Sequence, residues 1–249
     1  MQEHNKFSLN NSDQTILLVG HGSSSQPMSG KILQAYGQYI SSSENFRKVE
    51  VGAILGNPPL LDALQALKGS VRVLPVMMCN QHLVPDSINE FVEQNSEFSS
   101  AFQLSFLEPV GEAPEISNIA YSIAQDVVGN MNWDISKVTI NLVAHGSTRR
   151  PASRVMTEHH AQNLMLMLKC RKVLVSYLEE SPLFSDVVVD TCEPTISVGL
   201  FIGGGHHAVY DISKIINVDS PNKLHSFGGI VGDHFQFKEL ILNRASLSV

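Results

Sequence analysis

The 249-residue sequence lacks several features that mark well-known classes of protein. It has no excess of positive charge, because 17 Lys and Arg stand against 24 Asp and Glu, for a net charge of −7. A polyanion such as DNA or RNA is therefore not expected as a partner. Its longest apolar runs have strand length, well below the roughly 20 residues that a membrane-spanning helix needs. The composition thus predicts a protein that binds neither nucleic acid nor a membrane.

Cysteine is also scarce, with three copies far apart at Cys79, Cys170 and Cys192. They form no Cys-x-x-Cys pair and their number is odd, which argues against a disulfide framework and a zinc ribbon. The first residues lack the apolar stretch of an export signal. These features predict a soluble protein of the reducing cytoplasm.

What the sequence does contain is a motif that occurs twice. A buried-strand run that ends in His-Gly-Ser lies at residues 16–23 and again at residues 140–147. Some sixty residues after each copy comes another histidine, His82 or His207, with an aspartate four places further on. Self-similarity of this kind indicates an internal duplication.

The duplication predicts two domains of ordinary size, residues 14–129 and 130–249. Residues 1–13 are polar and aperiodic, and are expected to be a disordered lead-in. The segment 129–134, rich in Gly and Asn, is the expected linker.

In the first half, strand patterns alternate with helix patterns. Strands are expected at 15–20, 49–55, 71–78 and 101–107, and helices at 27–43, 58–67, 85–94 and 113–128. This order is typical of a parallel sheet with helices on both faces, in which ligands bind beyond the carboxyl ends of the strands.

The second half restarts the pattern less regularly. Strands are expected at 138–143, 187–190 and 196–202, with one long helix over 152–179 and a lost or reduced crossover helix before the last histidine pair. His21 and His82 are 61 residues apart, as are His145 and His206. The expected insertion and deletion make this equality partly accidental, so the shared His-x-Val-x-Asp pattern is used to align His82 with His207.

Histidines at strand ends are the chemically informative residues. A neutral imidazole binds borderline divalent metal ions and accepts a proton near neutral pH. His21, His82, His145 and His207 are therefore candidate metal ligands and bases. For any one of them a plain hydrogen-bonded strand-end residue is the alternative, and four at matched positions argue against it. The glycine run ending at Gly205 would let a flat ligand come close.

Charged residues distinguish the two halves. Glu193 follows the expected strand 187–190, where the first half has Asn57. Two imidazoles and one carboxylate make an incompletely filled coordination set that leaves room for a substrate. A carboxylate that caps the turn before Pro194 is the alternative.

Three arginines, Arg149, Arg150 and Arg154, follow His145, and the first half has no counterpart to them. Arginine binds carboxylates through two hydrogen bonds, so this segment could hold an acidic organic molecule. A solvated helix start would look similar.

Taken in order, these motifs resemble the class II tetrapyrrole chelatases, and within them the sirohydrochlorin cobaltochelatases and ferrochelatases of the CbiX/SirB type. The resemblance covers about residues 15–245. It rests on the two His-Gly-Ser openings, the two His-x-Val-x-Asp loops, Glu-Pro-Thr-Ile at 193–196, and the stretches 108–111 and 229–233. It implies two similar α/β subdomains of the flavodoxin-like or Rossmann-like class, with parallel sheets and a cleft between them.

The resemblance also implies a function. Such a protein inserts Co²⁺ or Fe²⁺, as a substrate, into the acidic tetrapyrrole sirohydrochlorin in cobalamin or sirohaem biosynthesis, needs no organic cofactor, and would be a monomer or homodimer. The metal-binding and proton-accepting residues carried over are His145, Glu193 and His207 in the second half, which is favoured as the working centre, and His21 and His82 in the first. Arg149, Arg150, Arg154, Ser147 and Gly205 would contact the macrocycle.

Two other functions stay open. The first half lacks the glutamate and the arginines, so a degenerate, non-catalytic carrier of metal or tetrapyrrole is the main alternative. A metal-dependent hydrolase is the other, and the sequence contains neither His-x-x-x-His on a helix nor Gly-x-Ser-x-Gly in its support.

Overall fold

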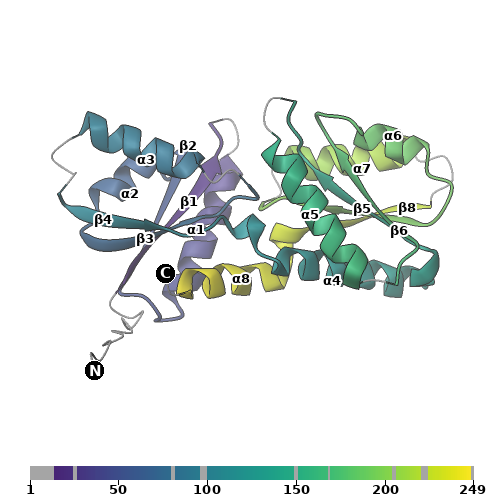
Figure 1. Cartoon of the computed structure of the whole chain (residues 1–249), viewed down its shortest axis with the longest axis horizontal. Helices are drawn as coiled ribbons and strands as arrows, with labels where there is room; N and C mark the ends of the chain where they lie inside the picture. The colour runs from purple at the N-terminus through teal and green to yellow at the C-terminus, as the bar shows by residue number, and fades with distance from the viewer. Residues whose placement is uncertain are drawn as a thin grey trace, which may run out of the picture. The chain divides into compact units, whose positions relative to one another are not determined.

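Each half of the chain folds around its own four-stranded, fully parallel sheet flanked by helices (Figure 1). The structure is a computed structural model, and it describes residues 14–24, 27–79, 82–95, 100–148, 151–167, 169–203, 206–219 and 224–247. Of Pro27, His206, His207, Ala208 and Asp219 it describes the backbone only. None of the helices in these ranges is both long and apolar enough to cross a bilayer.

The first half has the expected order of elements. They are β1 (Thr15–Gly22), α1 (Pro27–Ser41), β2 (Lys48–Leu55), α2 (Leu60–Gln65), β3 (Gly69–Pro75), α3 (Leu83–Gln94), β4 (Phe102–Phe106), the 3₁₀ turn η3 (Val110–Glu112) and α4 (Glu115–Met131). The strands lie in the order β2-β1-β3-β4. All four strands and four helices predicted for this half are confirmed, with ends shifted by a few residues.

The second half repeats this order. Its elements are η4 (Ile135–Lys137), β5 (Thr139–Ala144), α5 (Ala152–Met167), β6 (Lys172–Tyr177), α6 (Phe184–Val189), β7 (Thr195–Gly199), α7 (His206–Asp219), β8 (His225–Ile230), η5 (Val231–Asp233) and α8 (Phe235–Ser246). The strands lie in the order β6-β5-β7-β8. The α/β fold class with an internal duplication is thus confirmed.

Two of the residue ranges expected for elements of the second half are wrong. The helix expected over 152–179 ends at Met167, and β6 follows it, because an unbroken run of apolar and basic residues without Gly or Pro conceals the turn between them. The strand expected at 187–190 is the end of helix α6. Its valines favour a strand, but Phe184 and Val188 lie one helical turn apart and are both fully buried, so packing overrides propensity.

From the first strand to the helix after the third strand, the two halves are related by one constant shift in residue number. Strand pairing and hydrogen bonding relate β1 to β5, β2 to β6 and α2 to α6 by 124 residues throughout. In both halves the loop after the second strand folds back identically, because Ala53 N–H donates to Pro58 O and Tyr177 N–H donates to Pro182 O. No crossover helix has been lost, and the equal spacing of 61 residues between histidines is a property of the repeat.

This shift corrects the alignment of His82 with His207. It still holds beyond the third strand, where Val76 N–H donates to Val19 O and Leu200 N–H donates to Val143 O. It also makes the fully buried Ile88 of α3 equivalent to the fully buried Ile212 of α7. The same register makes His206 the equivalent of His82.

The strand order places the histidines at a switch point of the sheet. In each half the first strand lies between the second and the third, so the chain reverses its winding direction between β1 and β3 and between β5 and β7. Ligands of open parallel sheets bind in the crevice outside the carboxyl ends of such strands. His21 lies at the carboxyl end of β1 and His145 directly after β5. Helices α3 and α7 begin after the carboxyl ends of β3 and β7.

The chain divides into two compact units whose limits differ from those of the sequence repeats. One unit comprises Met1–Val76, Gln81–Glu108 and Ile241–Val249, and the other comprises Met77–Asn80 and Pro109–Leu240. Helix α4 closes the first repeat in sequence but packs on β7, β8 and α5 in the second unit. Its apolar stripe repeats every three or four residues and is buried there, at Ile116, Ile119, Ala120, Ile123 and Ala124.

The core of the second unit contains a buried polar network. Asn141 in β5 donates to Ser176 in β6 (2.9 Å) and to Ser197 in β7 (3.1 Å). Ser197 Oγ lies 2.7 Å from Nε2 of His225 in β8, and Thr191 Oγ1 lies 3.4 Å from its Nδ1. All five residues are buried.

The stability of the protein is expected to fall between pH 6.5 and pH 4 because of His225. Burial lowers the pKa of His225 to about 4, whereas an unfolded histidine titrates near 6.5. The unfolded chain therefore binds the extra proton in this window, which costs up to about 3 kcal/mol of folding free energy at pH 4. Urea denaturation of the wild type and of His225→Gln at pH 7 and pH 4.5 measures this cost. Equal pH dependence of the two would contradict the assignment.

Candidate metal-binding site

His145 lies just beyond the carboxyl end of β5 and is exposed. Its carbonyl oxygen accepts hydrogen bonds from the backbone N–H groups of Leu178 (3.2 Å) and Glu179 (3.0 Å), which follow β6. The two strand ends are thereby tied together, and the side chains that follow each strand are brought to the same edge of the sheet.

Glu179 is the acidic neighbour of His145. Its Oε1 lies 3.7 Å from Nδ1 of the imidazole, and both side chains are 63% exposed. Two donors that each lie about 2.1 Å from one ion are roughly 3–3.5 Å apart. The pair therefore needs only a small adjustment to bind the same divalent ion, and its exposure leaves coordination positions open.

Sequence reasoning missed Glu179, because residues 172–179 were assigned to a helix. A helix would have spread these side chains around its circumference. The available signal was the constant shift between the repeats, which places Glu179 at the position of Leu55, the last residue of β2.

The interpretation of Glu193 as a ligand beside His145 requires correction. Glu193 precedes β7 and lies at the amino-terminal edge of the sheet, because the Val-rich segment before it is helix α6. Its carboxylate accepts a hydrogen bond from Thr139 Oγ1 (2.7 Å) and pairs with Arg171 Nε (2.8 Å). Thr139 begins β5 and His145 follows its end, so the two edges are about 20 Å apart.

The first repeat places His21 differently. His21 is still within β1 and is exposed, and its Nδ1–H donates to Gly22 O at 2.9 Å, which leaves Nε2 with the lone pair. The position equivalent to Glu179 is the 44% exposed Leu55. His82 is exposed at the N-cap of α3. The first repeat thus offers imidazoles without the carboxylate at the matching strand end.

The residues expected to contact the macrocycle are placed only in part. Arg154 is bound within the protein, because its Nη2 lies 2.7 Å from Glu180 Oε2 and donates to Ser181 O at 2.6 Å. The hydrogen bond with Glu180 raises the pKa of Arg154 above its usual value. Ser147 donates its backbone N–H to Glu180 Oε1 (3.1 Å). Arg149, Arg150, Gly205 and the side chain of His207 lie outside the described residues, and their roles stay predictions.

Within the described residues no three His, Cys, Asp or Glu side chains form a metal-binding group. His145 and Glu179 supply two donors, and the backbone of α7 begins at His206 and His207, beyond the neighbouring strand β7. Cys79, at the matching edge of the first sheet, is a poor soft ligand, because burial and the nearby charge of Glu112 raise its thiol pKa.

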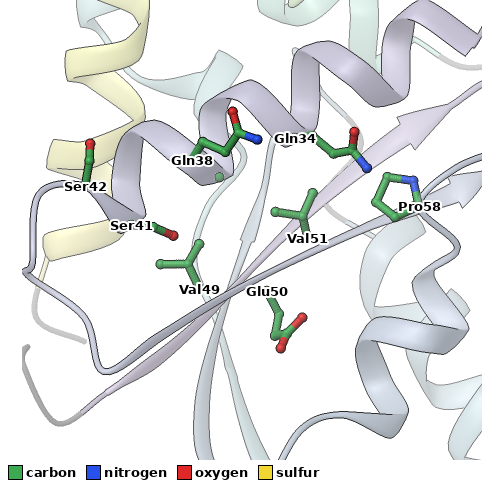
Figure 2. A pocket seen from close by; sticks show the side chains of 9 residues that line it. Gln34, Gln38, Ser41, Ser42, Val49, Glu50, Val51 and Pro58 are labelled. Atoms are coloured by element: carbon green, nitrogen blue, oxygen red, sulfur yellow. The ribbon is translucent and has the colours of Figure 1, made fainter.

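An open groove of about 720 Å³ lies elsewhere, between α1 and the edge strand β2 in the first unit (Figure 2). Its polar lining consists of Gln34, Gln38, Ser41, Ser42 and Glu50. Glu50 is paired with Lys48 at 2.7 Å, and no lining residue is a histidine or cysteine. The groove therefore does not offer the imidazole chemistry of the strand ends.

Comparison with known proteins agrees with the duplicated fold. A family model described as CbiX matches residues 15–127 and, a second time, residues 139–247. No curated protein sequence shows a match to this chain.

Several solved structures are similar. One is described as CbiX, the terminal enzyme for biosynthesis of siroheme in denitrifying bacteria; it is 18% identical, with a TM-score of 0.77, over 94% of this chain and 100% of that one. SirB from Bacillus subtilis with Fe³⁺ is 19% identical, with a TM-score of 0.76, over 93% of this chain and 94% of SirB. The sirohydrochlorin chelatase SirB from Bacillus subtilis subspecies spizizenii, in complex with cobalt, is 18% identical with a TM-score of 0.72, over 94% of each chain.

Proposed function

The chain belongs to the CbiX family, since the family model matches both of its halves, and we propose that it is a chelatase that inserts Co²⁺ or Fe²⁺ into sirohydrochlorin. The reaction would serve cobalamin or sirohaem biosynthesis. Imidazole and carboxylate donors suit both ions, so the site itself favours neither.

The observation that carries the proposal is the pair formed by His145 and Glu179. It lies at the carboxyl end of β5, beside the switch point of the second sheet, and combines a neutral ligand with an anionic one. The first repeat has Leu55 in place of the glutamate. We therefore assign the working centre to the second repeat.

In the proposed mechanism His145 and Glu179 bind a partly hydrated ion, together with an imidazole from His206 or His207 at the start of α7. The carboxylate offsets the charge of the ion. As the macrocycle binds, its nitrogens would displace the protein ligands one at a time, and each displaced imidazole or carboxylate could then accept the proton that a pyrrolic N–H group loses. Weak, open coordination is an advantage here, because a closed tetrahedral site would retain the ion.

Insertion is expected to be faster with the protein than without it. The test mixes purified protein with sirohydrochlorin and either Co²⁺ or Fe²⁺ and follows the absorption bands of the macrocycle, with a protein-free control. A carrier would bind the metal or the macrocycle in stoichiometric amount and leave the insertion rate at the uncatalysed value, which would sink the chelatase proposal.

A further inference from the structure

Glu180 follows Glu179 directly, but its environment is the opposite. The residue is only 9% exposed. One carboxylate oxygen accepts the backbone N–H of Ser147 at 3.1 Å, and the other accepts a hydrogen bond from Arg154 Nη2 at 2.7 Å. Glu180 therefore joins the loop that carries His145 to helix α5.

Arg154 is itself fixed on several sides. Besides Glu180, its guanidinium donates to Ser181 O at 2.6 Å and lies 4.9 Å from the ring centroid of the fully buried Tyr177. Glu158, one turn further along α5, is 3.8 Å away with its side chain 47% exposed, and a long, exposed pair of this kind contributes little to the hold on Arg154. A guanidinium held on a ring face and by two oxygens has little freedom to turn towards a substrate.

Gly146 packs against the same carboxylate. Its φ of +78° is a conformation that glycine adopts readily, and a Cβ at this position would lie 2.7 Å from both Glu180 Cγ and Tyr177 Cβ. The residues on either side of Gly146 are thus held as well, His145 through its carbonyl and Ser147 through its amide.

The first repeat is built without this arrangement. Gly30 stands at the position of Arg154 and Gly56 at that of Glu180, and both lie close to backbone oxygen atoms. There β1 continues through His21 to Gly22, which still pairs with Leu55 of β2. In the second repeat β5 ends at Ala144, paired with Tyr177, so the His-Gly-Ser loop has left the ladder and depends on other contacts.

We propose that the Glu180–Arg154 ion pair is a positioning device that holds His145 beside Glu179 for metal binding. The inference rests on the proposed function of that site. Of two adjacent glutamates, the exposed one binds the ion and the buried one orients the loop that carries its partner. Arg154, which the sequence suggested as a contact of the macrocycle, is accordingly a positioning residue.

A charge-removing cycle tests the pair, with Arg154→Met, Glu180→Gln and the double variant. Arg154→Met leaves a buried carboxylate without its cation. In Glu180→Gln the side chain has one oxygen instead of two, while Ser147 N–H and Arg154 still need an acceptor each. One of these two donors therefore faces the amide N–H groups of the glutamine. In the double variant the oxygen can accept from Ser147 while the amide N–H groups donate to Ser181 O. Loss of an outer contact of this kind typically weakens metal binding about 10- to 100-fold.

The primary measurement is the affinity for Co²⁺, which is determined from the visible absorption of the bound ion. Thermal unfolding checks that each variant folds. Each single variant is expected to bind Co²⁺ about 10- to 100-fold more weakly, and the double variant to come within about threefold of the wild type. Arg154→Lys keeps the positive charge and should weaken Co²⁺ binding less than about tenfold. This variant replaces Arg154→Met in the comparison if Arg154→Met does not fold. Glu158→Gln is the matched control on α5 and should change affinity less than about twofold.

The insertion assay adds a second measurement. Positioning predicts a lower kcat in Arg154→Met with an unchanged KM for sirohydrochlorin, whereas a macrocycle contact predicts a raised KM with unchanged Co²⁺ affinity, and that result would overturn the inference. Single variants that bind Co²⁺ like the wild type would also overturn it and leave the proposed function standing. If the single variants lost Co²⁺ affinity and the double variant regained it, but no protein catalysed insertion, the positioning role of the ion pair would be supported and the chelatase proposal rejected. A wild type that binds neither Co²⁺ nor Fe²⁺ would overturn both.

Discussion

Replacing His145 with alanine is expected to lower the rate of metal insertion into sirohydrochlorin at least about 100-fold. The substitution removes an exposed imidazole 3.7 Å from the carboxylate of Glu179, which we assign as both a ligand of the incoming ion and a proton acceptor. A residue that acts as base contributes about 10²- to 10⁴-fold to a rate. The insertion assay measures the effect, and a circular dichroism spectrum confirms that the variant folds.

The matched control is His21→Ala in the first repeat. His21 occupies the equivalent strand end, but the position equivalent to Glu179 holds Leu55 instead of a glutamate. We expect His21→Ala to retain more than about half of the wild-type rate. A residue that acts as the base would instead cost about 10²-fold or more when it is removed. An equal loss in both variants, or a loss only in His21→Ala, would move the working centre out of the second repeat.

Replacing Glu179 with glutamine is expected to weaken Co²⁺ binding and slow insertion at least about 10-fold, since loss of even an outer contact of a metal ligand typically costs about 10- to 100-fold. Glutamine preserves the size of the side chain and one oxygen donor, so the change isolates the negative charge that offsets the charge of the ion. Co²⁺ titration and the insertion assay measure the two effects separately. A loss of rate without a loss of affinity would assign Glu179 to proton transfer alone.

Glu193→Gln is the control for this substitution. Glu193 was the carboxylate favoured by the sequence, but it lies at the opposite edge of the sheet, bound to Thr139 and Arg171. Its substitution should change the free energy of unfolding by about 1 kcal/mol or less and the insertion rate by less than about twofold. If Glu193→Gln removed activity while Glu179→Gln did not, the site described above would be wrong.

The two repeats have diverged in a consistent way around the first strand. The second repeat has a carboxylate at the strand end, Glu179, and a buried ion pair between Glu180 and Arg154. The first repeat has glycines at the positions of that ion pair and an apolar residue at the strand end. A duplicated chain can specialise one copy in this manner while the other preserves the fold.

Much of the architecture could be predicted from the sequence. The buried runs 15–20 and 138–143 are long and apolar, and short glycine-containing turns end them, so both central strands and both strand-end histidines were located. The first half was predicted element by element, because Gly and Pro mark nearly every boundary there. The order of strands and helices then required a parallel sheet.

The errors have one origin, which is the missing punctuation between α5 and β6. Without Gly or Pro near residue 170, the helix pattern extends over β6 and leaves the segment of α6 in the place of the second strand, whereas the third strand is predicted where β7 lies. Glu193 thereby took the role of a strand-end carboxylate, and Glu179 was assigned to a helix surface. The constant shift of 124 residues would have prevented this error.

The sequence by itself determined that this protein is a duplicated α/β chain with a histidine at the same strand end in each copy, because buried strands and glycine turns are local patterns that composition and periodicity record. Only the tertiary structure decided which acid lies beside His145 and that Arg154 is bound to Glu180. Those contacts join β5, β6 and α5, and adjacency between strands is fixed by packing and by backbone hydrogen bonds across the sheet, which no local pattern encodes.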